Sequence, residues 1–414
     1  MAGLKYWVWL NECRGLTNRS RALLLDHFGS PEDVYYADEA EYALVEGLSK
    51  KQIELLADKS ADGADKILGD CQRLGLRILT MQDADYPARL RGIFEPPCLL
   101  YVKGTLPAFD EEVAVAMVGT RSCTPYGTSS AEKIAYGLAK QGALVVSGAA
   151  RGIDSAAHRG ALRAGGVTVA VLGNGLDVVY PEENAGLYRD IAATGALLSE
   201  YPPGTAAEGW HFPIRNRIIS GLALGVVVVE AAPRSGSLIT ARLALDQNRA
   251  VYAVPPPGWP FAFPADTTDA SDAKKAADAA ADCDGCARLL TEGACPALNA
   301  ADILTDLLPQ LRHLLDHVPA EQAAPPPLEP PLHPHTAAAP RSVSSRRNVP
   351  AYAPDSAEGR AVTLLQAHGP LHIDDLLSHL PDHNAGTLSA LLLMLELSGA
   401  VRRLPGAVYE ACPS

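Results

Sequence analysis

The sequence contains no run of about eighteen apolar residues, the length that a membrane-spanning helix requires. Its first residues, MAGLKYWVWLNECRG, also lack the apolar stretch and the small-residue cleavage site of a signal peptide. We therefore expect no membrane association and a cytoplasmic location. The 8 cysteines are scattered along a chain of 414 residues, a pattern that does not predict a disulfide framework.

A metal centre is not expected either. Cys283 and Cys286 have the spacing of two zinc ligands and Cys295 follows them, but no fourth Cys or His stands at finger spacing. The pattern therefore favours reduced thiols over zinc. We expect no metal and no other cofactor.

Basic charge is scarce as well. The net charge is −13, which argues at first sight against a nucleic-acid partner. Between residues 113 and 258, however, twelve Lys or Arg stand against ten Asp or Glu, so this block carries +2 and the remainder −15. An anion site must therefore be built from local clusters of arginine.

Two common nucleotide-binding motifs are missing. The sequence has no G-x-x-x-x-G-K-[ST], which makes an ATP-driven motor a poor interpretation. The first strand-to-helix turn reads Gly-Thr-Arg-Ser from Gly119 instead of G-x-G-x-x-G, and no acid ends the second strand. A dinucleotide site therefore fits poorly.

The length predicts about two to four domains. Residues 1–62 show short helices similar to a SAM or helix-hairpin-helix unit, in which Gly15-Leu16-Thr17 and Gly47-Leu48-Ser49 precede helices. Such turns can offer N–H groups to a phosphate, although a packing or partner module explains them equally well.

Residues 63–318 are predicted to form an α/β domain. Apolar strands alternate with helices between Val113 and Val254, which requires a parallel sheet with helices on both faces. The predicted strands are VAVAMVG, ALVVSG, VTVAVLG, ALLSE, GVVVVEA and AVYAVP. The predicted helices lie near 128–140, 153–164, 185–193, 215–221 and 238–247.

The remaining segments differ in composition. An Asp- and Ala-rich insertion at about 259–284 holds six Asp against two Lys, and residues 319–356 form a Pro-rich linker. Residues 357–414 show three helices and a two-stranded hairpin, which predicts a winged-helix domain. Its third helix, at 384–399, has no basic residue, so we favour a protein-contact or accessory role over DNA reading.

The candidate site lies where the strands end, because parallel sheets bind ligands at the carboxyl ends of their strands. Gly, Ser, Arg and aromatic residues gather there, and the mouth of a helix at Ser235 offers free N–H groups to an anion. The candidate residues are Gly119, Arg121, Tyr126, Arg151, Gly152, Phe212, Arg215, Asn216, Arg217, Ser235, Gly236 and Ser237.

Cations and amides mixed with rings are typical of single-strand binding, in which bases stack and the backbone lies in a cationic groove. Phe212, Trp210, Tyr126 and Tyr180 supply the rings. A duplex reader would instead present a helix to base edges.

Alternative interpretations remain open for the charged residues. The arginines could each be paired with Asp154, Glu200 or Glu230 and have only a structural role. Asp154 and His158, four apart on a predicted helix, could form a catalytic pair, although such residues more often cap and stabilise a helix start.

Compound motifs in this region resemble those of the DNA-processing protein A (DprA/Smf) family. They cover most of residues 66–255 in order. The motifs are Gly119-x-Arg121 with Tyr126-Gly127, Ser147-Gly148-x-x-x-Gly152-Ile153-Asp154-x-x-Ala157-His158, Gly173-x-Gly175-x-Asp177 with Tyr180-Pro181, Ser199-Glu200, Phe212-Pro213-x-Arg215-Asn216-Arg217-Ile218-Ile219 and Ser235-Gly236-Ser237-Leu238-Ile239-Thr240-Ala241.

This resemblance implies an extended Rossmann-like fold that forms a homodimer and is not an enzyme. It implies a protein that binds and protects incoming single-stranded DNA and loads the RecA recombinase onto it during natural transformation. The phosphate and base contacts would fall on the candidate residues given above.

The sequence departs from the family pattern at two places. Relatives place a basic residue just before the Phe-Pro, where this chain has Glu208-Gly209-Trp210, and their Gly-Asn-x-Leu-Ile ending is replaced by GCARLL from Gly285. A second hypothesis is an enzyme similar to the nucleoside-monophosphate phosphoribohydrolases. Their P-G-G-x-G-T-x-x-E stretch corresponds here to residues 231–240, which lack the Glu.

Overall fold

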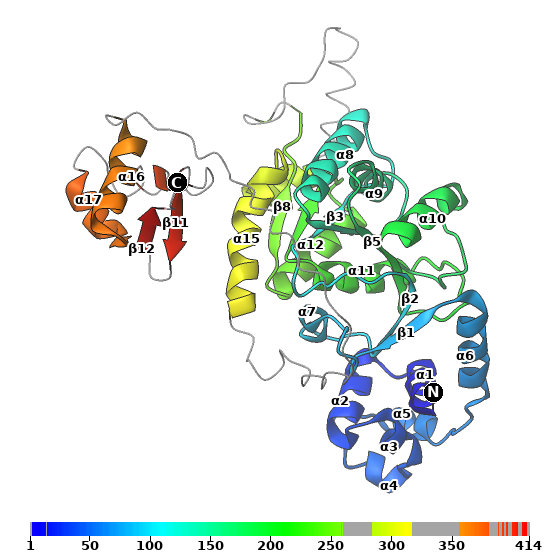
Figure 1. Cartoon of the computed structure of the whole chain (residues 1–414). Coiled ribbons are helices and arrows are strands. Elements are labelled where there is room, and N and C mark those ends of the chain that lie inside the picture. Colours follow the sequence, from blue (N-terminus) through cyan, green and yellow to red (C-terminus); the bar gives the residue numbers. More distant parts are fainter. Residues whose placement is uncertain are drawn as a thin grey trace, which may run out of the picture. The chain divides into compact units, whose positions relative to one another are not determined.

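A computed structural model of the chain describes residues 2–13, 15–257, 259, 284–316, 356–380, 388, 391–392, 395, 400–404 and 408–411. The chain divides into two compact units, Met1–Ala324 and Pro325–Ser414, and each is considered by itself (Figure 1). Nearly all of the predicted insertion and linker, and most of the predicted third helix of the winged-helix domain, lie outside the described residues.

The described part of the first unit is organised around a nine-stranded sheet with the strand order β1-β2-β6-β5-β4-β3-β7-β8-β9. Its strands are β1 (Arg77–Thr80), β2 (Leu99–Gly104), β3 (Ala114–Val118), β4 (Leu144–Ser147), β5 (Thr168–Leu172), β6 (Ala196–Ser199), β7 (Gly225–Val228), β8 (Ala250–Ala253) and β9 (Cys295–Pro296). The pairs from β6 through to β9 are parallel, whereas β2 pairs antiparallel with both β1 and β6. The six predicted strands and the α/β fold class are confirmed.

Helices cover both faces of this sheet, as the apolar strands require. Buried residues of α11 and α12, with α7, pack on one face, while α8, α9 and α15 pack on the other. The helices of this unit are α1 (Ala2–Glu12), α2 (Asn18–Phe28), α3 (Pro31–Tyr36), α4 (Glu39–Tyr42), α5 (Lys50–Leu56), α6 (Asp62–Leu74), α7 (Ala88–Arg91), α8 (Pro125–Lys140), α9 (Ile153–Arg163), α10 (Ala185–Thr194), α11 (His211–Leu222), α12 (Gly236–Asp246), α14 (Asp284–Thr291) and α15 (Ala300–Asp316), with a short 3-10 turn at Glu182–Asn184.

The N-terminal helices share a hydrophobic core with the sheet. Trp7 and Leu10 of α1 belong to the same buried cluster as Leu99 and Tyr101 of β2. Oxygen-bearing side chains cap the short helices of this region: Thr17 accepts from the amide of Ser20, and Ser49 from that of Gln52. The helical region is therefore packed on the antiparallel edge of the sheet.

The second unit contains α16 (Ala357–His368), α17 (Ile373–His379) and a three-stranded antiparallel sheet in the order β10-β12-β11. The strands are β10 (Leu371–His372), β11 (Val401–Leu404) and β12 (Val408–Ala411). The predicted hairpin corresponds to β11 and β12. The additional strand β10 is only two residues long, too short to show a period-two pattern in the sequence.

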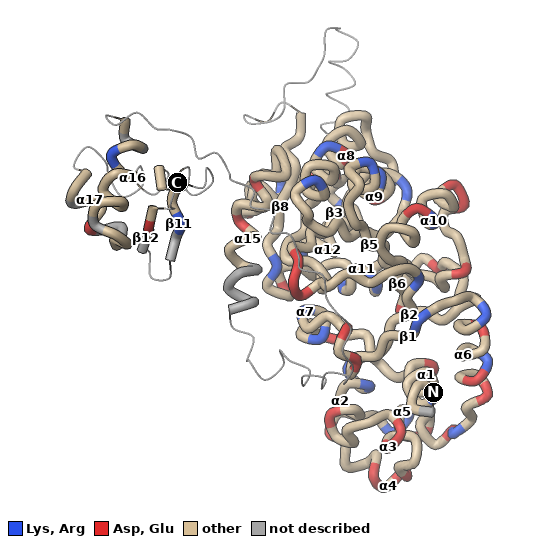
Figure 2. The backbone as a smooth tube through the Cα atoms, viewed as in Figure 1, with Lys and Arg blue, Asp and Glu red and all other residues tan. Residues whose placement is uncertain are grey.

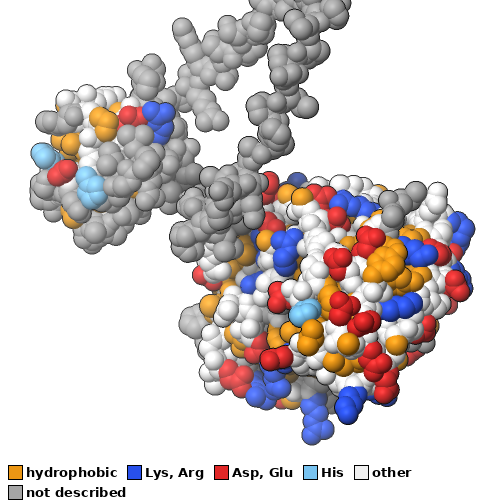
Figure 3. All heavy atoms as spheres, turned by 90° about the horizontal axis from the view of Figure 1, so that it is seen from below, with side chains coloured by type: hydrophobic (Ala, Val, Ile, Leu, Met, Phe, Trp, Pro, Cys, Tyr) orange, Lys and Arg blue, Asp and Glu red, His pale blue; other side chains and the backbone are white. Residues whose placement is uncertain are grey.

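Charged side chains are interspersed over the first unit. Figure 2 shows Lys or Arg and Asp or Glu spread over the helices and loops of this unit, with neither sign confined to one part. On the face drawn in Figure 3, acidic and basic side chains lie among apolar ones. This distribution agrees with the prediction that anion binding depends on local clusters of cations.

Two glycines with positive φ allow the packing of β2 against α10 to be tested, since Gly104 lies at that contact and Gly142 lies in open space and serves as its control. Gly104 has φ +100°, and a Cβ there would lie 2.6 Å from the carbonyl oxygen of Ala192, whereas Gly142 has φ +82° and nothing within 4 Å. We expect Gly142→Ala to lower the free energy of unfolding by about 1 kcal/mol, the cost of the backbone conformation alone. Gly104→Ala should lower it by roughly 2–4 kcal/mol, because the clash adds to that cost. Urea unfolding of the two variants measures the difference, and equal losses would contradict this account.

Candidate functional site

The candidate site lies between two neighbouring strands, β3 and β7, from which the chain continues toward opposite edges of the sheet. After β3 the chain crosses through α8 to β4 on one side, and after β7 it crosses through α12 to β8 on the other. The carboxyl ends of β3 and β7 therefore border a crevice, the usual ligand position in such sheets. A pocket of about 360 Å³ lies there, which we call the switch pocket.

Eight of the twelve predicted site residues line the switch pocket. These are Gly119, Arg121, Phe212, Arg215, Asn216, Ser235, Gly236 and Ser237. The other lining residues are neighbours that the sequence patterns did not single out as ligands, among them Thr120, Ala150, Gly209 and Thr240. Each of these four residues lies within three positions of a predicted site residue, which is how the sequence could have indicated them.

Arg215 brings a buried positive charge to the pocket. It is 4% exposed, and its Nη1 donates to the carbonyl oxygens of Gly148, at 2.9 Å, and Val171. Burial lowers the pKa of its guanidinium, and the nearby Asp154 opposes that shift. Its Nε has no hydrogen-bond partner among the described residues. A buried donor without a partner is costly and favours an acceptor in the pocket.

Gly148 is required by this arrangement. A Cβ at Gly148 would lie 2.6 Å from Nη2 of Arg215 and closer still to Nη1. Because real side chains do not approach so closely, the guanidinium can enter the strand ends only beside a glycine.

Arg121 and Phe212 form the open side of the pocket. Arg121 is exposed, and its guanidinium carbon lies 5.0 Å from the ring centroid of Phe212; that of Arg215 lies 5.8 Å from the same ring. The ring of Tyr180 lies 5.6 Å from Phe212 at an angle of 31°. Arg121 makes no ion pair with any residue that the structure describes. A cation free of a carboxylate therefore lies over an aromatic ring that can accept a base.

The start of α12 forms the third wall. Ser235 precedes the helix, and its Oγ accepts from the amide of Ser237 at 3.4 Å, while the two hydroxyls lie 2.7 Å apart. Gly236 has nothing near its Cβ position. The first amides of an eleven-residue helix, together with two hydroxyls, favour an anion at this wall.

Four predicted residues lie outside the switch pocket. Arg217 is buried, its Nη2 lies 2.7 Å from Glu200 Oε1, and its Nε donates to the carbonyl of Glu95. The prediction that Arg217 belongs to the same site as Arg215 is wrong. Residues two apart on a helix point about 200° apart around its axis, so the two side chains lie on different faces of α11. The ion pair with Glu200 was the alternative left open for it.

The remaining three also make other contacts. Arg151 is exposed and paired with Glu183, so of the four predicted arginines only Arg121 and Arg215 line the switch pocket. Tyr126 directs its hydroxyl to the carbonyl of Pro255 at 2.7 Å. Gly152, with φ +75°, lets its loop approach Thr120 and Arg121, whose carbonyl oxygens a Cβ would meet. It therefore shapes the pocket wall without lining it.

Glu230 stabilises the entrance to α8. This buried carboxylate accepts from the amide of Thr124 at 3.1 Å and from its hydroxyl at 2.8 Å. Thr124 in turn caps α8 by accepting from the amide of Gly127. Glu230 thus holds the loop that carries Arg121.

Asp154 and His158 do not form a catalytic pair at the pocket. Asp154 lines the pocket and accepts from the amide of Ala150 at 3.3 Å; burial raises its pKa, which Arg215 partly offsets. His158 is fully buried and bonded through Nδ1 to the hydroxyl of Thr168 at 2.7 Å. Burial, and then Arg215, lower the pKa of His158 to about 3, so this histidine is neutral at physiological pH.

Two of the three cysteines considered as zinc ligands are described, and they differ in exposure. Cys286 is buried, with Sγ 3.6 Å from the carbonyl of Val228, whereas Cys295 is exposed and Cys283 lies outside the described residues. Within the described ranges no three His, Cys, Asp or Glu side chains are grouped so that they could hold a metal ion. Nor is any helix in these ranges long and apolar enough to span a bilayer.

Comparisons with known proteins agree with this geometry. The family model "DNA recombination-mediator protein A" matches residues 77–308, and "DprA winged helix domain" matches residues 345–407. The predicted winged-helix domain is thereby confirmed.

Individual relatives give the same result. The chain is 40% identical to Protein Smf of Synechocystis sp. over 254 residues, 60% of this chain and 64% of that protein. It is 48% identical to DNA processing protein DprA of Streptococcus pneumoniae over 173 residues, 42% of this chain and 61% of that protein. The crystal structure of DprA from S. pneumoniae superposes with a TM-score of 0.60 at 34% identity, covering 73% of this chain and 97% of that one. The sequence matches thus span less than two thirds of these relatives' own length.

The buried histidine predicts how stability depends on pH. The pKa of His158 falls from 6.5 in the unfolded chain to about 3 when folded. Below pH 6.5 the unfolded state therefore takes up a proton that the folded state does not. We expect the free energy of unfolding to fall from pH 7.5 to pH 5, with His158 contributing up to about 1.4 kcal/mol per unit below 6.5. Urea unfolding of His158→Gln should show a shallower fall, and equal falls in the two proteins would contradict the assignment.

Proposed function

Because the chain belongs to the DNA recombination-mediator protein A family, we propose that it binds single-stranded DNA at the switch pocket, protects it, and loads RecA recombinase onto it during natural transformation. The observation that carries the proposal is the convergence on one pocket of a buried arginine with a free donor, an exposed arginine over a ring, and a helix start.

Each wall of the pocket suits one part of a nucleotide. The amides and hydroxyls at the start of α12 and the Nε of Arg215 are donors for phosphate oxygens. The half-buried ring of Phe212 offers a base a stacking surface, and the nearby Arg121 supplies a cation that can contact the backbone. A ligand that carries both an anion and a flat ring satisfies all three walls at once.

The dimensions favour a single strand over a duplex. A pocket of about 360 Å³ holds one or two nucleotide units and not a double helix. Its aromatic ring lies at the carboxyl edge of the sheet, on the first turn of α11, where bases must be unpaired to stack on it. Duplex reading would require an exposed helix directed at base edges.

The geometry favours binding over catalysis. His158, the natural general base of the Asp154 pair, is buried at the core side of α9 and bonded to Thr168. The loop that follows β7 contains Arg234 and Ser235 and lacks the glutamate of the phosphoribohydrolases. The proposal therefore includes no hydrolytic step, in agreement with the resemblance of the sequence.

The proposed partners follow from family membership. We extend the proposal to a homodimer that contacts RecA, and to a winged-helix unit with an accessory role. In that unit the described cations include Arg402, which is paired with Glu410, so this cation is not free for a phosphate.

Removal of Arg121 tests the proposal. We expect Arg121→Ala to weaken binding of a labelled oligo-dT and to reduce the slope of log K against log salt by about 0.7 to 1, the share of one phosphate contact. Fluorescence anisotropy across a salt series measures both quantities.

A matched control is available on the opposite edge of the sheet. Arg163, at the end of α9, is exposed and paired with Glu132, so Arg163→Ala removes one positive charge without touching the switch pocket. It should bind like the parent. Equal binding by the parent and Arg121→Ala would reject the site, and release of free base from a nucleoside monophosphate would favour the enzyme instead.

A further inference from the structure

A second hollow lies on the other side of α11. It has a volume of about 700 Å³ and separates the N-terminal helices from the start of α11. Gly15, Leu16, Thr17 and Asn18 line one wall, and Trp210, His211 and Ile214 line the other. We propose that this α2–α11 groove holds one further nucleotide of the bound strand, with its base on Trp210 and its phosphate at the start of α2. This inference rests on the proposed function.

The α11 wall is an aromatic platform. Trp210 is 59% exposed, and its Nε1 donates to Glu208 at 2.5 Å, which fixes the indole. The ring of His211 lies 4.0 Å from that of Trp210 and 4.0 Å from that of Tyr201. The indole of Trp210 is exposed, but its contacts with Glu208 and His211 already restrict its motion. A base that stacks on it therefore causes little further loss of side-chain entropy.

His211 supplies an independent sign of a ligand. It is 3% exposed and lines the groove, and its Nδ1 has no hydrogen-bond partner among the described residues. A buried ring nitrogen without a partner is costly. A polar ligand in the groove would remove that cost.

The α2 wall is suited to a phosphate. α2 has eleven residues and no acid in its first turn, and the side chain of Thr17 accepts from the amide of Ser20. The amide of Asn18 comes before the first intrahelical bond and has no partner within the helix. Gly15, with φ +101°, lies in the turn that places Asn18 at the groove. This is the Gly-Leu-Thr turn that resembles a helix-hairpin-helix unit.

Acidic side chains at the floor of the groove favour a neutral base at that position over a second phosphate. Glu12, Glu95 and Glu200 line the groove. Among the residues that the structure describes, Arg21 is the one arginine that lines the groove, and it donates to the carbonyls of Leu10 and Asn11 and to Asn18 Oδ1. A neutral base fits among these groups, whereas a phosphate is favoured only at the amides of α2.

The groove and the switch pocket lie on different sides of the start of α11. Gly209, Phe212 and Pro213 line the switch pocket, while the interleaved residues Trp210, His211 and Ile214 line the groove. The first turn of α11 therefore forms the partition between them. A strand that stacks on Phe212 can cross this turn and place its next base on Trp210.

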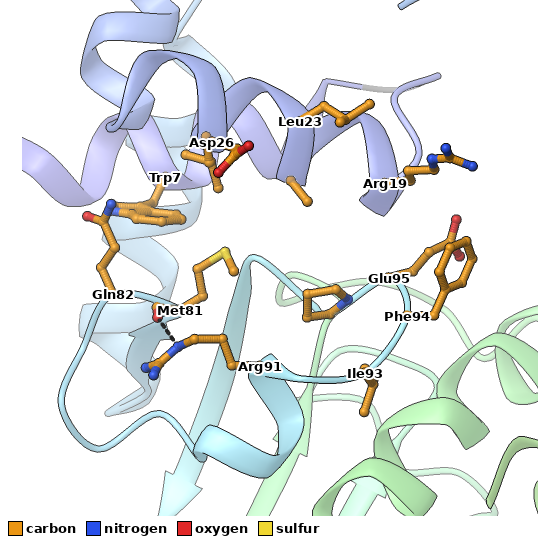
Figure 4. Close-up of a pocket in the computed structure, with 13 residues that line it drawn as sticks. Trp7, Arg19, Leu23, Asp26, Met81, Gln82, Arg91, Ile93, Phe94 and Glu95 are labelled. Carbon is orange, nitrogen blue, oxygen red and sulfur yellow. Dashed lines mark hydrogen bonds between the residues drawn. The ribbon is translucent and has the colours of Figure 1, made fainter. Parts of the chain in front are cut away.

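A neighbouring hollow provides a contrast. Figure 4 shows it between α2 and the loop at residues 93–96, with a volume of about 630 Å³ and the largely apolar side chains of Trp7, Leu23, Met81 and Phe94 around it. Phe94 is 71% exposed, so it is a second free ring in the same region. This hollow shares Glu95 with the groove, but Phe94 itself lines neither the groove nor the switch pocket, which makes Phe94 a suitable control.

The base position is tested with Trp210→Ala in the full chain. We expect roughly tenfold weaker binding of a labelled oligo-dT by anisotropy, the effect of one lost stacking contact, with an unchanged salt slope. Phe94→Ala removes a ring that is even more exposed, from the neighbouring hollow, and should bind like the parent.

The phosphate position is tested with Asn18→Asp. This change keeps the oxygen that accepts from Nη1 of Arg21 at 3.0 Å, and an acid at a helix start stabilises the helix. The added charge repels a phosphate, so we expect roughly threefold to tenfold weaker binding. Ala40→Glu, on exposed α4, adds the same charge away from the groove and should have no effect.

The outcomes separate the groove from the switch pocket. If Trp210→Ala and Asn18→Asp both bind like the parent while Arg121→Ala binds more weakly, the groove is rejected and the proposed function stands. If the parent does not bind oligo-dT, or if Arg121→Ala binds like the parent, the proposed function fails and the groove proposal fails with it.

Discussion

The buried guanidinium of Arg215 is the interaction on which the rest of the site depends. It is held by the carbonyl oxygens of Gly148 and Val171 at the ends of β4 and β5. Removing an arginine from water costs several kcal/mol, so the carbonyl groups and the nearby Asp154 must compensate. This requirement fixes α11 over the strand ends and excludes a side chain at position 148. The same fixed helix then places Phe212 beside Arg121.

Helix α11 contributes side chains to three surfaces, because successive residues of a helix point about 100° apart around its axis. Phe212, Arg215 and Ile219 of α11 face the switch pocket. Arg217 faces the opposite way, where its contacts with Glu200 and Glu95 join α11 to β6 and to the loop after α7. His211 and Ile214 face the groove beside α2. The ion pair of Arg217 is therefore structural, and it holds the partition between the two hollows in place.

The sequence predicted the elements better than their mutual contacts. Six parallel strands and the helices between them follow from apolar runs of the right length. Of the eight predicted site residues that line the switch pocket, five follow β3 or β7, whereas Phe212, Arg215 and Asn216 lie on α11 and were predicted from their residue types. Strand β2 was not predicted, and its antiparallel pairing with β6, in which Gly104 is paired with Ala196, joins segments that are distant in the sequence. Arg217 was wrongly assigned to the site because it was chosen for its positive charge, without regard to the direction in which its side chain leaves the helix. The contact of Tyr126 with Pro255 depends on two distant segments, which no local pattern records.

The acidic total charge is compatible with this cationic pocket because charges are screened beyond about 8 Å at physiological salt. Within that distance of a bound phosphate, Arg215, Arg121 and the start of α12 dominate, since Glu230 and Glu200 are already engaged by Thr124 and Arg217. Beyond it, the acidic side chains interspersed over the unit give no attraction at long range. Such a surface gains little from electrostatic steering and binds polyanions weakly outside the pocket. In the proposed function, affinity must therefore come from donors of the pocket placed around a phosphate and from stacking on Phe212, and only an unpaired strand exposes base faces for that stacking.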